Sequence, residues 1–328
     1  MTSHVIITGA NGFVGRACVA EARRRKLVVM ALYRSTPDPA WADDAKIHPV
    51  QADLTNPDSL QPLLDVPGHA VFIHAAGSMS DDPAQLALDN ITATGFLPLQ
   101  PGQKVVLISS LAVYDTGQMS PGDTLDENSP ILDIPAEMDS QVTNTIASAP
   151  SPYALAKRVQ EFMIDPADRD LWILRPGAIW GPGRSWHALM GFWASKLHVT
   201  IGSDGELPLC HVEHVARAAV EAACTPANGA RILNVFDDDR PTRKRFLRAH
   251  RRCYGWPRFN ITVPYGLWLS MIRLLKPVSG KLPGLFREPI LRARMMPLRY
   301  PNTRLRSAFR GEDIDTFEGM MTRTRDAE

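Results

Sequence analysis

Three glycines, each three residues after the last, interrupt the chain close to its beginning, at Gly9, Gly12 and Gly15. An apolar run at residues 4–8 precedes them, and residues 16–26 have the character of a helix. Glycine allows the backbone to turn sharply and to approach a pyrophosphate closely, and the N–H groups and dipole of the following helix meet the phosphate charge. The spacing fits the common dinucleotide fingerprint only loosely, but the order of strand, glycine loop and helix predicts a dinucleotide-binding loop.

Short apolar runs alternate with helical stretches through the first 180 residues, and a chain of 328 residues can hold such a domain and a smaller lobe. The candidate strands are residues 5–8, 28–32, 47–51, 70–74, 104–109 and 171–175. Strands that alternate with helices form a parallel sheet with right-handed crossovers. The sequence therefore predicts an α/β fold. We expect a doubly wound Rossmann domain over residues 1–180 and a substrate lobe over 181–328, some segments of which return to the first domain.

The net charge of +1 conceals a strong asymmetry along the chain. Residues 240–310 hold 18 of the 36 Lys and Arg residues but a single acid, Glu288. Such a block can attract an anionic membrane surface or a phosphate-bearing substrate. Equally, it can dock on an acidic domain of the same chain or on a second subunit, and both interpretations stay open. Nucleic acid is not an expected partner, because the block contains no recognisable reading motif.

Cysteine usage and hydropathy favour a cytoplasmic protein, membrane-peripheral if the basic block binds lipid. The four cysteines form no CxxC pair, which suggests neither a zinc site nor a disulfide framework. No cleaved leader is expected. The longest apolar stretch, residues 261–275, is shorter than the roughly 20 residues of a spanning helix. We expect no metal site, since the spacing of the following histidines matches no standard ligand set: His187, His198, His211 and His214.

The residues after the second and third candidate strands bear on cofactor choice. An NAD-selective protein usually places an acid after its second strand, whereas this chain has Arg34, which suits a 2′-phosphate and favours NADP over NAD. Asp53 and Leu54 follow the third strand. They can contact the adenine, although an Asp at this place is equally often a turn former.

Tyr153 and Lys157 stand four residues apart in a predicted helix, so their side chains lie on one face. A free tyrosine has a pKa of about 10, and a nearby ammonium lowers the pKa toward the working range. Tyr153 could then exchange a proton with a substrate oxygen, while Ser110 donates a hydrogen bond to the same oxygen. Alone this pattern is weak evidence, because it also occurs on many helix surfaces.

The surrounding motifs make the chain resemble the extended short-chain dehydrogenase/reductase superfamily, in its NAD-dependent epimerase/dehydratase group. The resemblance covers about residues 4–240. It rests on six motifs in order: Thr8-Gly9-Ala10-Asn11-Gly12-Phe13-Val14-Gly15, Asp53-Leu54, His74-Ala75-Ala76-Gly77, Ser109-Ser110-Leu111-Ala112-Val113-Tyr114, Pro152-Tyr153-Ala154-Leu155-Ala156-Lys157 and Leu174-Arg175-Pro176-Gly177-Ala178-Ile179-Trp180-Gly181-Pro182-Gly183.

The resemblance implies roles for individual residues. Ser110, Tyr153 and Lys157 would be the catalytic triad, with Lys157 also holding the nicotinamide ribose. Asn90 matches a position that orders this site, although it could equally be a satisfied buried polar group. The expected cofactor-binding residues are Gly9, Asn11, Gly12, Phe13, Val14, Gly15, Arg34, Asp53, Leu54, Ala75, Ala76, Asn90, Tyr153, Lys157 and Pro176.

Departures from the family patterns narrow the expected reaction. Leu111 and Ala112 stand where family dehydratases carry Asp-Glu, which disfavours dehydration. Ala178 and Leu207 replace two groups that grip the nucleotide of a UDP-sugar. The motif around Pro176 looks more like the 3β-hydroxysteroid dehydrogenase and dihydroflavonol reductase branches, whose substrates are apolar.

We therefore expect an NAD(P)-dependent dehydrogenase or reductase, with NADP favoured, that acts on a ketone or secondary alcohol of a hydrophobic small molecule. The family resemblance also makes a homodimer an open expectation. Two alternatives remain: a nucleotide-sugar epimerase with tightly bound NAD, and a non-catalytic dinucleotide-binding protein.

Overall fold

The computed structural model describes residues 1–328 except 1–3, 65–69, 140, 165–168, 203–204 and 276–283. Its internal contacts divide the chain into two compact units. Unit 1 comprises Met1–Val113, Leu132–Pro176 and Val212–Val235. Unit 2 comprises Tyr114–Ile131, Gly177–His211 and Phe236–Glu328. Each unit is therefore assembled from three separate stretches of the chain.

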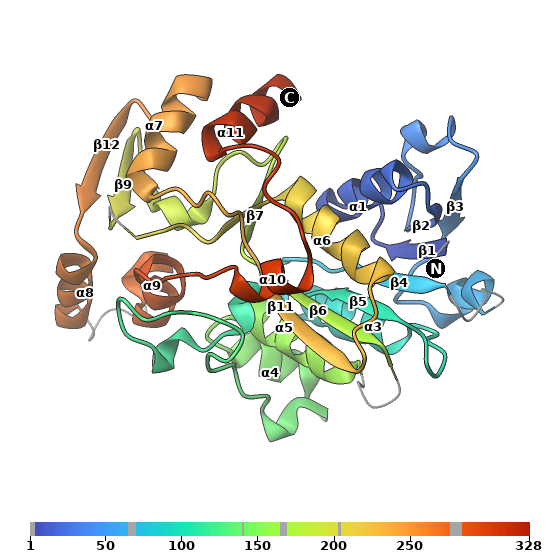
Figure 1. Ribbon diagram of the computed structural model, residues 1–328. Coiled ribbons are helices and arrows are strands. Elements are labelled where there is room, and N and C mark those ends of the chain that lie inside the picture. The colour runs from blue at the N-terminus through green and yellow to red at the C-terminus, as the bar shows by residue number, and fades with distance from the viewer. Residues whose placement is uncertain (1–3, 65–69, 140, 165–168, 203–204, 276–283) are drawn as a thin grey trace. The chain divides into compact units, whose positions relative to one another are not determined.

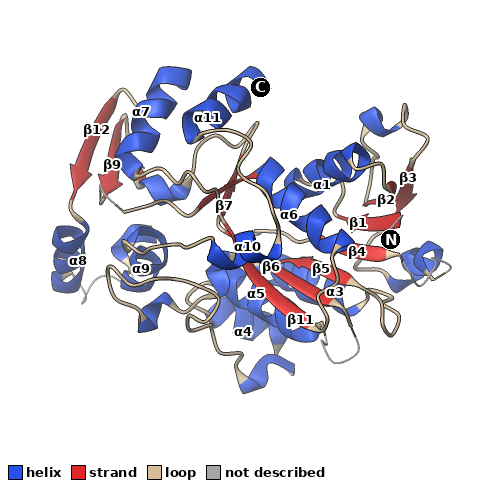
Figure 2. Cartoon of the chain, viewed as in Figure 1, coloured by secondary structure: helices blue, strands red, loops and turns tan. Residues whose placement is uncertain are grey.

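Unit 1 is built on a parallel sheet of seven strands, drawn in red in Figure 2. The order across the sheet is β11-β6-β5-β4-β1-β2-β3. The order reverses at β1, and such a switch point is where open α/β sheets bind ligands. In chain order the strands are β1 (His4–Thr8), β2 (Val28–Tyr33), β3 (Ile47–Gln51), β4 (Val71–His74), β5 (Val105–Ile108), β6 (Leu171–Pro176) and β11 (Ala230–Val235).

The predicted α/β fold is confirmed, and each of the six predicted strands ends within one residue of its expected bounds. They were recognisable because strands of a parallel sheet are covered on both faces and read as apolar runs. Every residue of β4 and of β5 is buried. The seventh strand, β11, was missed. It begins with two exposed residues, Ala230 and Arg231, which weaken its apolar signal.

Helices flank this sheet. Helix α6 packs against α1, and the two lie side by side in Figure 1; α6 also contacts β4, β5 and β6. Helix α5 packs against α2 and α4 through a second apolar cluster that includes Leu86, Ile146 and Leu155. The helices of unit 1 are α1 (Phe13–Arg24), α2 (Pro83–Ala87), the π-helix η3 (Leu88–Thr92), α3 (Ala93–Gly95), α4 (Val142–Ser148), α5 (Pro152–Met163) and α6 (Val212–Cys224), with the short 3₁₀ turns η1 (Pro39–Trp41), η2 (Pro57–Leu63), η4 (Leu111–Val113) and η6 (Ala136–Asp139).

Unit 2 combines two small sheets with five helices among its described residues. Strands β7 and β10 form a parallel pair, and β12, β9 and β8 form a three-stranded sheet in that order. The elements are β7 (Ala178–Trp180), β8 (Phe192–Ala194), β9 (Leu197–Ile201), β10 (Leu209–His211), β12 (Phe259–Val263), α7 (Arg243–Tyr254), α8 (Tyr265–Leu274), α9 (Glu288–Met295), α10 (Thr303–Ala308) and α11 (Phe317–Asp326), with the 3₁₀ turns η5 (Thr116–Gln118), η7 (Ala188–Met190) and η9 (Gly284–Phe286).

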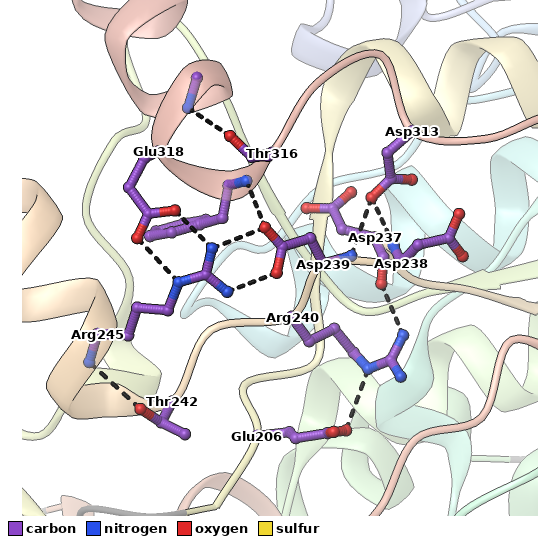
Figure 3. A network of polar contacts seen from close by, with 12 residues as sticks. Glu206, Asp237, Asp238, Asp239, Arg240, Thr242, Arg245, Asp313, Thr316 and Glu318 are labelled. Atoms are coloured by element: carbon purple, nitrogen blue, oxygen red, sulfur yellow. Dashed lines mark hydrogen bonds and ion pairs between the residues drawn. The ribbon is translucent and has the colours of Figure 1, made fainter.

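An ion-pair network in unit 2 uses part of the basic block (Figure 3). The Nε of Arg245 donates to Glu318 Oε1 at 2.8 Å, and its Nη2 donates to Asp239 Oδ2 at 2.7 Å. Arg240 Nε contacts Glu206 Oε2 at 3.1 Å. These contacts join α7 and α11 to the segment that precedes α7. Some of the positive charge of residues 240–310 is thus balanced inside the same unit.

The apolar stretch 261–275 folds into the end of β12 and into α8 rather than into one long helix. Among the described residues, none of the helices has the length and apolar character needed to cross a membrane.

Candidate active site

The glycine loop between β1 and α1 is packed so closely that a side chain would not fit at Gly9 or at Gly15. A Cβ on Gly9, whose φ is +62°, would lie 2.8 Å from the Cα of Ala76, and one on Gly15 would lie 2.0 Å from the Gly9 carbonyl oxygen. The N–H of Gly12 donates to the same oxygen at 2.8 Å. The loop therefore seats on the residues after β4 and presents the N-terminus of α1, an arrangement suited to an anion.

The remaining loop residues hold its position. Asn11 donates from Nδ2 to the carbonyl oxygen of Thr36, which ties the loop to the segment after β2. The Oδ1 of Asn11 is buried and has no partner among the described residues. Phe13 and Val14 form the first turn of α1 and are half-buried. All of these expected cofactor contacts therefore lie at the carboxyl end of β1.

Arg34 stands at the end of β2, with its guanidinium exposed. Its only ion pair among the described residues is a 3.4 Å contact between Nη1 and Asp89 Oδ1, and 66% of its side chain is accessible. Gln51 donates to its carbonyl oxygen at 3.2 Å, which fixes the backbone at this point. The Arg34 guanidinium is thus available where a ribose 2′-phosphate is expected.

The structure gives Asp53 the turn-forming role. Its Oδ1 accepts hydrogen bonds from the backbone N–H of Thr55 at 2.9 Å and from the Thr55 hydroxyl at 2.7 Å. These bonds hold the pKa of Asp53 below its usual value. Leu54 is buried in the core of unit 1. The adenine contacts expected of both residues remain predictions.

Tyr153 and Ser110 meet across two elements of unit 1. Tyr153 lies in the first turn of α5, where Pro152 occupies the first helical position favoured by proline. Ser110 follows β5, and its side chain acts on the Tyr153 phenol as a hydrogen-bonding group that lowers the pKa of that phenol. Burial raises the pKa of Tyr153, and the bond from Ser110 opposes this only in part. This corrects the sequence-based expectation of a lowered pKa, which assumed that the Lys157 ammonium would dominate.

The Lys157 ammonium is engaged elsewhere. Its Nζ donates to the carbonyl oxygen of Ile108 at 3.0 Å and to Gln160 Oε1 at 2.8 Å. Burial lowers the pKa of Lys157 to about 8, with Glu161 acting in the opposite direction. The lysine is therefore held between the end of β5 and the next turn of its own helix, and close to neutral pH it can change charge readily.

Gln160 extends this contact into a buried polar chain. Because a lysine only donates, the Gln160 oxygen must face Lys157, and its Nε2 then points to Thr94 Oγ1 at 2.8 Å and to His74 Nε2 at 3.0 Å. The other His74 nitrogen, Nδ1, lies 2.7 Å from Thr8 Oγ1. Burial lowers the pKa of His74 to about 3, so its ring is neutral. We infer that the ring proton sits on Nδ1, since Nε2 accepts from Gln160.

Asn90 lies beside this chain in the π-helix η3. It is fully buried, and its Nδ2 donates to Leu86 O at 2.9 Å and to Ser78 O at 3.2 Å. Its Oδ1 has no partner within the described part of the chain. A Cβ on Gly77 would lie 2.6 Å from that oxygen and 3.2 Å from Lys157 Nζ. The expected site residue Asn90 and the lysine therefore border the same small space.

A buried ion pair stabilises the end of β5, directly before Ser110. Arg175 Nη2 lies 2.7 Å from Glu161 Oε2, and only 2% and 3% of these side chains are exposed. Glu161 Oε1 also accepts a hydrogen bond from the Ser109 hydroxyl at 2.6 Å. Pro176 ends β6 directly after this arginine and is buried. The pair joins α5 to the ends of β5 and β6, which fixes the distance between the three.

The structure thus brings most of the expected residues to the carboxyl ends of β1, β4 and β5. Sequence reasoning missed Gln160, His74 and Thr94 as polar neighbours of Lys157. The spacing of Gln160 three residues after Lys157 places both on one helix face and was the available signal. His74 stands in one of the six family motifs, but no pattern linked it or Thr94 to Lys157, because only the fold brings them to α5.

Comparisons with known proteins agree with this architecture. A curated relative described as "Ceramide reductase", from Caulobacter vibrioides (strain NA1000 / CB15N), is 28% identical over 258 residues, which span 76% of this chain and 70% of the relative. Among solved structures, a UDP-glucuronic acid 4-epimerase from Bacillus cereus in complex with NAD matches with a TM-score of 0.65 and 16% identity, covering 99% of this chain and 98% of that one.

A UDP-N-acetylglucosamine 4-epimerase from Methanobrevibacter ruminantium M1 in complex with UDP-N-acetylmuramic acid matches with a TM-score of 0.68 and 17% identity, again over 99% and 98% of the two chains. At such identities these structures support the fold alone. The model of the family described as "NAD dependent epimerase/dehydratase family" matches residues 5–235, which is most of the chain. The chain therefore belongs to the NAD-dependent epimerase/dehydratase family, a family of NAD-dependent enzymes.

Proposed function

We propose that this enzyme is a reductase that uses NADP and moves a hydride between the nicotinamide and a ketone or secondary alcohol of a hydrophobic substrate, of the ceramide type. The observation that carries the proposal is the arrangement of Ser110, Tyr153 and Lys157, in which Ser110 lies near enough to Tyr153 to lower its pKa and Lys157 is fixed on the same helix. Such an arrangement can transfer a proton to a substrate oxygen.

In the proposed reaction the chain handles the proton and the developing charge. The dinucleotide, when bound, supplies the hydride that adds to the carbonyl carbon. Tyr153 donates its phenolic proton to the carbonyl oxygen, and the Ser110 hydroxyl donates a hydrogen bond to that oxygen as its negative charge grows. Lys157 can replace the tyrosine proton, because its pKa of about 8 lies near working pH. The product is a secondary alcohol, and the reverse sequence oxidises it.

The substrate class is supported by the absence of polar residues that dehydratases and nucleotide-sugar epimerases carry. Leu111 and Ala112 follow Ser110 and offer no acid or base for dehydration. Ala178 and Leu207 offer no polar grip for a nucleotide-sugar. The relative named as a ceramide reductase suggests a lipid with a long-chain base. A ceramide contains a secondary alcohol, and its ketone form is a substrate on which Tyr153 and Ser110 could act.

NADP is proposed because of Arg34. It is exposed at the end of β2, and among the described residues it has only one long contact to an acid. No acid takes the place usually occupied by the carboxylate that binds the ribose diol of NAD. The same glycine loop also suits NAD.

The test compares Tyr153→Phe with the matched variant Tyr254→Phe, which alters a tyrosine of unit 2. Oxidation of NADPH would be followed with the ketone form of a ceramide as substrate. Tyr153→Phe should lose at least about a hundredfold in kcat while it still binds NADPH, because a general acid contributes about 10²–10⁴ in rate. Tyr254→Phe should keep its turnover. Unchanged turnover in Tyr153→Phe would exclude the proposed mechanism.

The dinucleotide carried by the purified protein separates the proposal from its alternatives. The protein is denatured, and any released dinucleotide is identified by mass and counted. No dinucleotide, or loosely held NADP(H), agrees with a reductase that exchanges its cofactor. Stoichiometric, tightly held NAD together with conversion of a UDP-sugar would identify an epimerase. Binding without turnover of any ketone or alcohol would identify a non-catalytic dinucleotide-binding protein.

A further inference from the structure

Unit 2 carries a group of exposed apolar side chains, one of which, Trp256, also packs against the rings of Trp186, Trp193 and His250. They lie in one short stretch of chain that runs from the end of α7 through β12 and α8 (Figure 1). Large apolar side chains are normally scattered singly on a protein surface, so a group of them suggests a contact surface. Its members and their exposed fractions are Trp256 36%, Phe259 64%, Ile261 49%, Leu267 63% and Leu274 83%.

Backbone geometry aligns these side chains in pairs. Phe259 and Ile261 stand two residues apart on β12, so they share one face of the strand. β12 is an outer strand of its three-stranded sheet. Leu267 and Leu274 stand seven residues apart on α8, so they share one face of that helix. Trp268 and Ile272 of the same helix are buried, which leaves the Leu267–Leu274 face pointing away from the core.

Arginines accompany this apolar group, and acids do not. Residues 251–274 contain Arg251, Arg252, Arg258 and Arg273 without a single Asp or Glu, and all four arginines are exposed. Arg273 pairs with Glu288 at 2.8 Å. Among the described residues, neither Arg252 nor Arg258 has an acidic side chain within ion-pair distance.

The rest of the basic block gives a contrast. Arg245 reaches both Asp239 and Glu318, as Figure 3 shows, and Arg306 pairs with Asp238 and Asp313. Internal ion pairs therefore account for some of the arginines before and after the stretch 251–274. They do not account for Arg252 and Arg258, which stand next to the exposed apolar side chains.

We propose that Arg251, Arg252, Trp256, Arg258, Phe259, Ile261, Leu267 and Leu274, named here the β12–α8 surface, dock on an anionic lipid bilayer. Apolar side chains enter the boundary between headgroups and acyl chains, and arginines beside them attract acidic lipid. A second copy of this chain fits the surface less well, because pairing would bring its arginines against like charges. The proposal goes beyond the reductase function and is independent of it.

The test is co-sedimentation of the full chain with vesicles of phosphatidylcholine alone and with vesicles that also contain phosphatidylglycerol. The variants are Phe259→Ser/Leu274→Ser and Arg252→Glu/Arg258→Glu. Matched controls are Phe162→Ser, which alters a phenylalanine with 70% exposure on α5, and Lys46→Glu, which alters an exposed lysine of unit 1. Thermal unfolding checks that each variant is folded, and no substrate or dinucleotide is added.

The wild type should bind the acidic vesicles and not the neutral ones, and salt should weaken this binding. Each arginine should contribute about fivefold, which corresponds to about 1 kcal/mol, so the double arginine variant should lose at least about 25-fold. The double apolar variant should lose at least about tenfold, and both controls should bind like the wild type. Equal binding to both kinds of vesicle, absence of binding, or full binding by the patch variants would overturn the proposal. A dimer in solution that the same variants abolish would overturn it in favour of a second copy as occupant.

Discussion

Lys157 owes its position to two acceptors, the carbonyl oxygen of Ile108 and the side-chain oxygen of Gln160. The first belongs to the strand that leads to Ser110, and the second lies one turn further along α5. Burial makes the charged form of this lysine costly, so each acceptor matters more than it would in water. Gln160 is therefore a positioning residue that acts on the chemistry through Lys157.

Replacement of Gln160 by Leu should lower kcat by about tenfold and destabilise the fold by about 1–3 kcal/mol, because the buried ammonium loses an acceptor. The pKa of Lys157 should fall further below about 8, which moves the alkaline limb of the pH–rate profile to lower pH. Gln160→Glu should move that limb upward, since a carboxylate favours the charged ammonium.

The matched control for this series is Gln103→Leu, because Gln103 is also buried and donates to Ala70 O at 3.1 Å, away from Lys157. It should lose stability and keep its pH profile. A common pH profile for both leucine variants would mean that Gln160 has a merely structural role.

Arg34 offers a prediction about cofactor choice. Arg34→Ala should weaken NADPH binding by about tenfold or more and leave NADH binding nearly unchanged, because a single charge-assisted contact to a phosphate is lost. Dissociation constants for both dinucleotides, measured by fluorescence titration, would test this. Arg24→Ala, at the far end of α1, should change neither. Equal weakening of both dinucleotides would remove the basis for proposing NADP.

At the scale of elements, the loop between β1 and α1 depends on the absence of side chains. The Cβ of an alanine at position 15 would lie 2.0 Å from the Gly9 carbonyl oxygen, whereas one at position 12 would lie 3.0 Å from it. The N-terminus of α1 can therefore reach the end of β1 only with glycine at position 15. Position 12 leaves room for a small adjustment.

Gly15→Ala should consequently displace the helix from the loop and destabilise the protein. Dinucleotide binding should fall by at least about a hundredfold, because the displaced backbone N–H groups lose their hydrogen bonds to the phosphates. Gly12→Ala should show a much smaller loss of both. Calorimetric titration with NADPH and thermal unfolding of the two variants would measure this. If Gly15→Ala bound the dinucleotide like the wild type, the loop would not have the role assigned to it.

Elements also show where prediction from sequence reached its limit. The six predicted strands were found because their apolar runs are local. The π-helix η3, which carries Asn90, was not foreseen, because nothing in the residues 88–92 distinguishes it from an ordinary helical turn. The loop between strand and helix at Gly9 and Gly15 was predicted, because the spacing of the glycines is a local feature of the sequence.

At the scale of the whole molecule, His74 links the stability of unit 1 to pH. Its pKa is lowered from 6.5 to about 3 in the folded protein, because the ring is fully buried. Between these two pH values the unfolded chain binds more protons than the folded one. The contribution of His74 to the free energy of unfolding is therefore fully present above about pH 6.5 and is lost as the pH falls toward about 3.

Urea unfolding of the wild type should therefore lose about 2–3 kcal/mol between about pH 7 and about pH 4.5 through this one residue. His74→Asn should be less stable at neutral pH and should lose less on acidification. His48→Asn replaces an exposed histidine of β3 and should keep the acid sensitivity of the wild type. An unchanged acid sensitivity in His74→Asn would show that other groups control it.

The charge asymmetry of the chain became interpretable only at this scale. The sequence left open whether residues 240–310 meet acids of the same chain or an external partner. Internal ion pairs take up Arg240, Arg245 and Arg306, while Arg252 and Arg258 stay beside exposed apolar side chains. Internal pairing is therefore shown for part of the basic block, while a contact of Arg252 and Arg258 with an anionic partner stays a proposal.

Short-range patterns were enough to predict the α/β class, the parallel strands, the glycine loop and the helix that carries Tyr153 and Lys157, because apolar runs, glycine spacing and helical periodicity act within a few residues. The return of β11 to the sheet, the Lys157–Gln160–His74 chain and the raised pKa of Tyr153 were decided by tertiary structure. Long-range hydrogen bonds join His74 to Thr8, 66 residues away, and to Gln160, 86 residues away, and only the folded chain brings such partners within bonding distance.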